Sequence, residues 1–371
     1  MSLIGNQMKI LTILGARPQF IKSAVVSSEL KKIGLCEEII VHTGQHYDDN
    51  MSNIFFEQLS LQSPKYNLGV GSGAHGYQTG MMMIRLEEVI LEEKPTAIIV
   101  YGDTNSTLAG SLVAAKLQIQ AIHIEAGLRS WNRSMPEETN RVVSDHIADI
   151  LFSPTETSVT NLINEGISKT KIDLVGDVMY DIFLRQESLL KNLNNALEKH
   201  NLKKGDYILA TLHRAENTDN LDRLKAIITA LDMLGQQFQV VMPLHPRTLT
   251  QLKANLLVKN YRNITILEPV GYLEMYELEA NSMLICTDSG GVQKEAYFHR
   301  VPCVTYRKET EWLELVSSGW NYLVEPTDAE SIYKTFLKAL ETQTASLPEI
   351  NYGGGKASEE IAKKIVSYKF G

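Results

Sequence analysis

Cysteine is scarce in this sequence, and its few positions exclude two kinds of structure. Only Cys36, Cys286 and Cys303 occur among 371 residues. Their spacing fits neither a disulfide framework nor a zinc site, so we expect no bound metal. Two of the three stand in apolar, strand-like runs and are best explained as buried thiols. An odd, sparse count is typical of a reducing cytoplasm.

Long apolar runs and an excess of positive charge are also missing. No run approaches the roughly 18 residues that a membrane-spanning helix needs, and residues 1–7 lack the basic and apolar regions of a signal peptide. Lys and Arg number 36 against 44 Asp and Glu, giving a formal net charge of −8. Because non-specific nucleic-acid binding needs a basic surface, we expect a cytoplasmic protein that binds neither nucleic acid nor membrane.

Two common enzyme motifs are absent as well. No Gly-x-Gly-x-x-Gly follows the first apolar run, which argues against a nicotinamide site. No Gly-x-Ser-x-Gly occurs, which argues against a serine hydrolase.

What the sequence does contain is a regular alternation of strand-like and helix-like segments. Apolar residues 9–14 are followed by a turn at 15–18 and by helical periodicity from 19 to 33. Repeats of this unit predict a parallel sheet, and a second series begins after Asp177. We therefore predict an α/β protein with two doubly wound domains, residues 1–177 and 178–354. Three glycines precede the last helical segment, and we expect this C-terminal helix, within 355–371, to pack back on the first domain.

Three acidic residues stand where parallel strands should end. Asp103 and Glu125 closely follow the apolar runs 97–100 and 121–122, and Glu137 lies in the next loop. Ligands of open α/β sheets bind beyond the carboxyl ends of the strands. The arrangement therefore favours acid/base chemistry over solvation.

Each of these carboxylates also has a structural explanation. Asp103 could cap the following helix, since Asp is favoured at that position. Glu137 and Glu138 could supply negative charge to the first turn of a helix. Glu125 is harder to explain in this way, because a carboxylate at a buried strand end needs a partner, which Arg129 or Arg141 could supply.

Two strand-to-helix turns have the composition of anion sites. In the second half, Ser289-Gly290-Gly291 opens a helix whose N-terminal N–H groups favour phosphate, and Glu295 could accept a ribose diol. The alternative is an N-capped turn without a ligand. In the first half, Arg17 and Lys22 stand at a helix N-terminus, where a cation is unfavourable unless an anionic ligand is shared. The alternative is that Lys22 points to solvent.

Two histidines end strands of the second half. His213-Arg214 follows the apolar run 208–212, and His245 follows the run 239–242. A lone histidine is more often structural, but two at strand ends that face one crevice favour proton transfer.

Many segments together carry a resemblance to a known family, although no single one is specific. They are Gly15-Ala16-Arg17-Pro18 through Lys22, Thr43-Gly44-Gln45-His46-Tyr47, Gly102-Asp103-Thr104-Asn105-Ser106-Thr107, His123-Ile124-Glu125-Ala126-Gly127-Leu128-Arg129, Pro136-Glu137-Glu138-Thr139-Asn140-Arg141, Gly176-Asp177-Val178, Thr211-Leu212-His213-Arg214, His245-Pro246, residues 287–295 and Thr310-Glu311-Trp312. The chain resembles the non-hydrolysing UDP-N-acetylglucosamine 2-epimerases over nearly its whole length.

The resemblance implies a fold, a reaction and a set of site residues. The fold is glycosyltransferase-B-like, with two Rossmann-like domains and the active site in the interdomain cleft. The reaction is anti elimination of UDP to give 2-acetamidoglucal, followed by re-addition of UDP with inverted configuration at C2, without metal or redox cofactor. The implied catalytic residues are Asp103, Glu125, Glu137 and His213. We expect Asp103 or Glu137 to take the C2 proton. The implied substrate-binding residues are Arg17, Lys22, Arg141, Arg214, His245, Tyr272, Ser289, Gly290, Gly291 and Glu295. The resemblance also implies a homodimer that serves polysaccharide biosynthesis.

The sequence departs from the family pattern at two places. Many bacterial members are activated by a second UDP-N-acetylglucosamine, but Tyr47-Asp48-Asp49 and Ala215 replace residues of the motifs linked to that activation, which argues against it here.

Loop 130–135 is similar to that of relatives acting on UDP-2,3-diacetamido-2,3-dideoxyglucuronate, and Arg133 could pair with the carboxylate of that substrate. A solvated loop arginine is the alternative. A sugar transferase of the same architecture, a hydrolysing relative and a UDP-sugar sensor remain as less favoured functions.

Overall fold

The computed structural model describes residues 8–45, 61–190, 195–244, 246–254, 262–342 and 344–368. The chain divides into two compact units, Met1–Gln186 with Asn351–Gly371, and Glu187–Ile350. The division therefore falls inside helix α7 (Val178–Leu190), beyond the boundary anticipated at Asp177. Within the described segments, no helix is long and apolar enough to cross a bilayer.

The first unit is built on a seven-stranded sheet in which every pairing is parallel. The strand order is β3-β2-β1-β4-β5-β6-β7. Its central strands are the apolar runs of the sequence; all five residues of β4, for example, are buried. The strands are β1 Met8–Leu14, β2 Cys36–His42, β3 Tyr66–Asn67, β4 Ala97–Tyr101, β5 Gln120–Ile124, β6 Ile150–Ser153 and β7 Ile172–Leu174.

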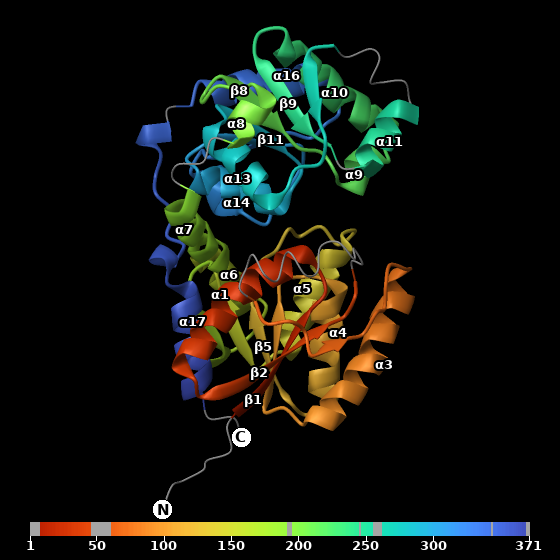
Figure 1. Cartoon of the computed structure of the whole chain (residues 1–371), viewed down its shortest axis with the longest axis vertical. Helices are drawn as coiled ribbons and strands as arrows, with labels where there is room; N and C mark the ends of the chain where they lie inside the picture. The colour runs from red at the N-terminus through yellow and green to blue at the C-terminus, as the bar shows by residue number, and fades with distance from the viewer. Residues whose placement is uncertain are drawn as a thin grey trace, which may run out of the picture. The chain divides into compact units, whose positions relative to one another are not determined.

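Helices cover both sides of this sheet. Figure 1 shows α1 and α17 on one side of the sheet and α3 and α4 on the other, and α1 packs against α17. The helices of the unit are α1 Arg17–Ile33, α3 His75–Glu93, α4 Asn105–Lys116, α5 Pro136–Ile147, α6 Glu156–Asn164, α7 Val178–Leu190 and α17 Ala357–Ser367, with short 3-10 turns at Lys169–Lys171 and Gly353–Gly355.

A buried carboxylate of α7 caps the C-terminal helix and ties it to the first unit. Buried Asp181 of α7 accepts hydrogen bonds from the N–H of Ala357 (3.1 Å), the N–H of Ser358 (2.7 Å) and the Ser358 hydroxyl (2.6 Å). These are the first N–H groups of α17, which have no partner within the helix. Asp181 therefore acts as a cap supplied from a distant segment.

Asp181→Ala should accordingly lower the free energy of unfolding by about 1–3 kcal/mol, because it leaves two buried N–H groups without an acceptor. Urea unfolding measures the loss, and hydrogen exchange of the α17 amides locates it. Ser358→Ala is the matched control, since it removes only the hydroxyl donor and should cost less. Unchanged protection of the α17 amides would contradict this role.

Glu93, the last residue of α3, links the helix to two strands. Its carboxylate accepts from Lys65 Nζ, from the Tyr66 hydroxyl at 2.6 Å and from Lys9 Nζ at 3.0 Å. The hydrogen bond from Lys65, followed by those from Tyr66 and Lys9, lowers the pKa of Glu93 from 4.5 to about 2. The ionised form thus stabilises the fold above the unfolded pKa, and this stabilisation is lost as the pH falls from about 4.5 toward 2.

We expect Glu93→Gln to be less stable than wild type at neutral pH and to lose less of its remaining stability on acidification. Urea midpoints measured between neutral pH and pH about 2 test both parts. Exposed Glu92 supplies the control, and Glu92→Gln should follow the wild-type curve. Parallel acid curves for wild type and Glu93→Gln would disprove the contribution.

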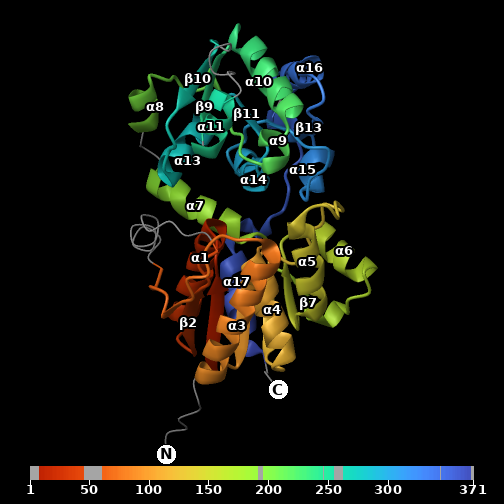
Figure 2. The same cartoon turned by 90° about the vertical axis from the view of Figure 1, so that its right-hand side faces the viewer.

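The second unit repeats the same construction with six strands. Their order is β10-β9-β8-β11-β12-β13, again with parallel pairings throughout. The strands are β8 Tyr207–Ala210, β9 Gln239–Pro243, β10 Ile264–Leu267, β11 Leu284–Thr287, β12 Cys303–Thr305 and β13 Asn321–Leu323. The helices are α8 Asn195–His200, α9 Ala215–Thr218, α10 Leu221–Gly235, α11 Pro246–Ala254, α13 Tyr272–Asn281, α14 Gly290–Phe298, α15 Leu313–Ser317 and α16 Ala329–Leu340, with a 3-10 turn at Thr344–Ser346 (Figure 2).

The sequence predictions for these elements are mostly confirmed. The α/β class with two parallel sheets is correct, and Cys286 and Cys303 are buried free thiols. Burial raises the pKa of Cys303 to about 12, so this thiol is un-ionised at neutral pH. Helix α7 begins at Val178, where the Asp177 carboxylate accepts from the Met179 N–H at 2.8 Å.

The strand orders determine where ligands can bind. In each sheet the chain order reverses once, between β1 and β4 in the first unit and between β8 and β11 in the second. Helices that follow the two strands of such a pair leave in opposite directions, which opens a crevice beyond their carboxyl ends. The candidate residues at these strand ends therefore stand at the positions that the topology favours.

Candidate active site

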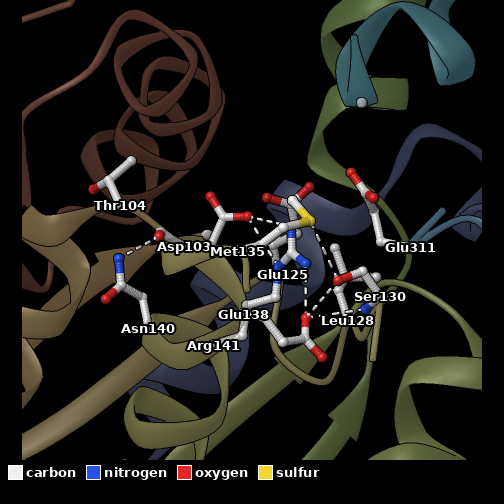
Figure 3. A network of polar contacts seen from close by, with 12 residues as sticks. Asp103, Thr104, Glu125, Leu128, Ser130, Met135, Glu138, Asn140, Arg141 and Glu311 are labelled. Carbon is white, nitrogen blue, oxygen red and sulfur yellow. Dashed lines mark hydrogen bonds and ion pairs between the residues drawn. The ribbon is translucent and has the colours of Figure 1, made fainter. Parts of the chain in front are cut away.

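Asp103 lies in the turn that follows β4 and is held by helix α5. Arg141 donates to Asp103 Oδ2 from Nε (2.9 Å) and Nη2 (2.5 Å), and Asn140 donates to the Asp103 carbonyl (2.9 Å). Figure 3 shows these contacts converging on the turn. Asp103 does not cap α4, because Thr104 occupies that position and accepts from the Thr107 N–H. The capping explanation for Asp103 is therefore wrong.

Gly102 shapes this turn for two reasons. Its φ is +62°, in the left-handed region that favours glycine. A Cβ at this position would also lie 3.2 Å from Glu125 Oε2. The glycine thus lets the Glu125 carboxylate approach the turn that carries Asp103.

Glu125 follows β5 in a backbone conformation that side chains rarely adopt, with φ of +71°. Such outliers cost of order 1 kcal/mol and cluster at functional sites. Its buried carboxylate forms an ion pair with Lys22 of α1. Lys22 therefore does not point to solvent, and that alternative is wrong. Arg129 was a candidate partner of Glu125, but it binds Asp145 and Glu165 instead, so this pairing is wrong too.

The two glutamates in the first turn of α5 have different environments. Glu137 is exposed, whereas Glu138 is buried. Glu138 accepts from the N–H groups of Ser130 (3.0 Å) and Trp131 (2.9 Å) and from Arg141 Nη1 (3.0 Å), as Figure 3 shows in part. Burial raises the pKa of Glu138, but these donors outweigh it and leave that pKa below its ordinary value. Glu138 thus holds the loop and Arg141, while Glu137 remains accessible.

A chain of buried amides, which the sequence did not reveal, supports the same turn. Asn140 donates to Asn105 Oδ1 at 3.2 Å, and Asn105 donates to Gln78 Oε1 at 2.8 Å. Gln78 in turn donates to the Gly71 carbonyl at 2.8 Å. The only sequence signal was the position of Asn105 and Asn140 beside charged candidates.

The turn before α1 differs from an open anion site. The N–H groups of Gly15 (2.7 Å) and Ala16 (3.1 Å) both donate to Gln19 Oε1. Gln19 also donates to the Tyr101 carbonyl at 2.8 Å, which ties α1 to the end of β4. An anion here would therefore be bound by side chains such as half-buried Arg17 rather than by these two backbone groups.

In the second unit, Asp288 organises the ends of β8 and β11. It is fully buried and accepts from the N–H groups of His213 (3.2 Å) and Arg214 (3.0 Å) and from Asn217 Nδ2 (3.2 Å). Its Oδ1 also lies 3.2 Å from His213 Nδ1, while the His213 side chain is 51% exposed. Nδ1 of His213 therefore faces Asp288, and Nε2, on the other side of this half-exposed ring, could contact a ligand.

The turn beside this pair begins helix α14, and Ser289 is its N-cap residue. Ser289 Oγ accepts from the Val292 N–H at 3.4 Å. Arg214 Nη2 lies 3.8 Å from the position of a Cβ on Gly290, so its guanidinium reaches the N-terminus of α14. A guanidinium, a histidine and the positive end of a helix thus meet at the β8 and β11 ends.

Comparison with known proteins identifies the family. The family model described as UDP-N-acetylglucosamine 2-epimerase matches residues 28–366. The chain belongs to the UDP-N-acetylglucosamine 2-epimerase family. The predicted family is thereby confirmed, as is the prediction of an isomerase with a glycosyltransferase-B-like fold.

Individual relatives of this epimerase family are similar over almost their full length. A UDP-N-acetylglucosamine 2-epimerase homolog of Methanococcus maripaludis is 52% identical, with 96% of this chain and 99% of the relative covered. The UDP-2,3-diacetamido-2,3-dideoxy-D-glucuronate 2-epimerase of Pseudomonas aeruginosa is 50% identical, with 96% and 99% covered. The crystal structure of the Methanocaldococcus jannaschii UDP-GlcNAc 2-epimerase, in complex with UDP-GlcNAc and UDP, has a TM-score of 0.90 at 45% identity and covers 97% of this chain and 100% of its own.

The structure describes the remaining predicted site residues to different extents. Glu295 is half-buried on α14, and Gly291 is exposed in its first turn. Tyr272 begins α13, but its side chain lies outside the described structure, as does His245 entirely. Within the described ranges, no group of three or more His, Cys, Asp or Glu residues could hold a metal ion.

Proposed function

We propose that this epimerase interconverts UDP-N-acetylglucosamine and UDP-N-acetylmannosamine without hydrolysing them. The observation that carries this proposal is the set of carboxylates in the first unit, each in a different environment. Asp103 is paired with Arg141, Glu125 is buried against Lys22, and Glu137 is exposed. Groups of one chemical type in different environments can divide the tasks of acid and base.

The proposed reaction begins with a proton transfer from C2 of the sugar to a carboxylate. The electron pair of the C2–H bond forms the C1–C2 double bond, and the C1–O bond breaks with its electron pair on the departing UDP. We assign the C2 proton to Asp103 or Glu137. UDP then bonds again to C1, while a proton is added to C2 from the opposite face.

The departing diphosphate needs positive partners in the second unit. We assign this role to Arg214, to His213 through Nε2 and to the N-terminus of α14 at Ser289. Donors already in position stabilise developing charge without reorganisation, which is a large contribution in many enzymes. Glu295 and Tyr272 are proposed for the ribose and the uracil, and His245 joins the diphosphate set as a prediction.

A second substrate, UDP-2,3-diacetamido-2,3-dideoxyglucuronate, is favoured by one feature. Arg133 is exposed in the loop that Glu138 holds in place, so its guanidinium could pair with the carboxylate of such a sugar. The 50% identical Pseudomonas relative is named for that substrate. If this substrate were the true one, Arg133→Gln would raise its KM and leave turnover of UDP-N-acetylglucosamine unchanged.

Product analysis tests the proposed function. The enzyme is incubated with UDP-N-acetylglucosamine, and the sugars are separated and identified by NMR. We expect UDP-N-acetylmannosamine, with the UDP-sugar total conserved. Free N-acetylmannosamine with UDP would indicate a hydrolysing enzyme, while conversion of the diacetamido sugar alone would favour the second substrate. No change in either sugar would refute the epimerase proposal.

We also propose a cytoplasmic homodimer that supplies an activated sugar for polysaccharide synthesis. Support for the dimer comes from a stripe on α3, where Tyr77 (63%), Ile84 (56%) and Leu91 (58%) are exposed at intervals of seven residues. Such spacing keeps side chains on one side of a helix. Two helices packed along these stripes would bury them.

Replacing the three stripe residues by serine should shift the protein from dimer to monomer. Sedimentation velocity measures the change directly. Leu35 is equally exposed (60%) but lies outside α3, so Leu35→Ser should remain dimeric. A dimer that survives the triple substitution would show that another surface forms it.

A further inference from the structure

His123 is a buried titratable residue for which the proposed reaction has no role. It lies in β5 between strands β4 and β6, two positions before Glu125, and is 1% exposed. Its ring nevertheless makes two short hydrogen bonds. Nδ1 is 2.7 Å from Asp145 Oδ1, and Nε2 is 2.7 Å from the Gly102 carbonyl oxygen.

The partners of these bonds decide where the ring protons are. A carbonyl oxygen can only accept, so Nε2 must carry a proton. Asp145 accepts from Arg129 Nη1 (2.7 Å) and from the Gly127 N–H (3.1 Å), which identifies it as an ionised carboxylate. An ionised carboxylate also only accepts, so Nδ1 must carry a proton as well.

The charges around the ring support the same conclusion. The groups in contact around this ring are Asp145 from α5, Arg129 from the loop after β5, and Glu165 at the end of α6, which Arg129 binds through two bonds of 2.7 Å. His146 of α5 lies at the edge of this group, with Nδ1 3.8 Å from Glu165 Oε2 and 2.8 Å from the Val142 carbonyl oxygen. Among the four connected groups two carboxylates oppose one guanidinium, and a doubly protonated His123 ring makes their sum neutral. Burial raises the pKa of Asp145, but its contacts with His123 and Arg129 outweigh this and leave that pKa lowered.

We propose that His123 is a buried imidazolium that clamps the peptide between Gly102 and Asp103 and so positions Asp103 for proton transfer. The protonation of His123 and its hold on the Gly102 carbonyl are argued from the hydrogen bonds alone. The positioning of Asp103 for proton transfer rests on the proposed function. His123 and Asn140 hold this short turn from two sides, through the carbonyls of Gly102 and Asp103. His123 is thus a positioning residue rather than a catalytic one.

Nitrogen-15 NMR of protein labelled in its histidine rings tests the protonation state without any need for activity. We expect one ring, assigned by its absence in His123→Gln, to show both nitrogens protonated at neutral pH. In Asp145→Asn the same ring should lose one proton, because its anionic partner is gone. A wild-type ring with one unprotonated nitrogen would overturn the proposal.

Kinetics of His123→Gln tests the positioning role. Glutamine is neutral and can replace only one of the two donated bonds, so we expect kcat to fall at least about tenfold with little change in KM. UDP affinity should change little, because His123 contacts none of the proposed diphosphate partners Arg214, His213 and Ser289. Turnover near that of wild type would overturn the positioning role even if the ring proved to be doubly protonated. A wild-type enzyme that epimerises neither sugar would instead refute the proposed function and leave the NMR result to stand separately.

Discussion

Asp103→Asn is expected to lower kcat about 10³-fold while UDP still binds with its normal affinity. The amide keeps the size of the side chain and can still accept a hydrogen bond from Arg141, but it cannot take up a proton from C2. General acid/base groups typically contribute between about 10² and 10⁴ in rate. Initial rates of epimerisation and a calorimetric titration with UDP measure the two quantities.

Structural damage has to be separated from lost chemistry in this experiment. Exposed Glu156 in the first turn of α6 provides a charge-matched control, and Glu156→Gln should keep wild-type kinetics. Melting temperatures of both variants should lie close to that of wild type. If Asp103→Asn retained most of its turnover, the C2 proton would have to be assigned to another carboxylate.

Asp288→Asn should have the second-largest effect, about a hundredfold loss in kcat with a smaller change in KM. The carboxylate of Asp288 lies 3.2 Å from His213 Nδ1, so it can accept from that nitrogen while Nε2–H donates to the diphosphate, and its negative charge favours this doubly protonated ring. An asparagine amide can donate to Nδ1 instead, which leaves a neutral ring and removes positive charge from the departing diphosphate. Loss of such charge stabilisation lowers the rate without removing the residue.

The split between kcat and KM distinguishes this role from a structural one. Asp328 caps α16 by accepting from the Ser331 N–H at 2.8 Å, so Asp328→Asn should affect stability and leave both constants unchanged. Histidine-ring NMR should show Nδ1 of His213 protonated in the wild type and unprotonated in Asp288→Asn. An Asp288→Asn enzyme that is merely less stable, with wild-type kcat and unchanged ring protonation, would refute the assignment.

The positions of the candidate residues were predictable, but their partners were not. Apolar runs such as 97–100 fix a strand and its carboxyl end, so Asp103 could be placed at the sheet edge from the sequence alone. Lys22, a partner of Glu125, is 103 residues away in the chain, and neither periodicity nor spacing encodes that contact. The nearer Arg129 looked suitable but is occupied by Asp145 and Glu165.

Helix geometry explains two further differences. Glu137 and Glu138 are adjacent in sequence, yet about 100° of rotation per residue exposes one and buries the other. Gln19 lies three residues after Ala16, the spacing at which a side chain reaches back to the start of a helix, so its capture of the Ala16 N–H could have been predicted. His123 carried no usable signal, because a histidine within an apolar strand is compatible with many roles.

Isotope exchange at C2 tests the central claim most directly. The enzyme is incubated in D2O with UDP-N-acetylglucosamine, and the hydrogen at C2 is followed by NMR. Removal of this proton to a carboxylate predicts that UDP-N-acetylmannosamine forms with deuterium at C2 and that Asp103→Asn forms it about 10³-fold more slowly. Epimerised product that keeps its original hydrogen at C2 would contradict the account, since no proton would then have left the sugar.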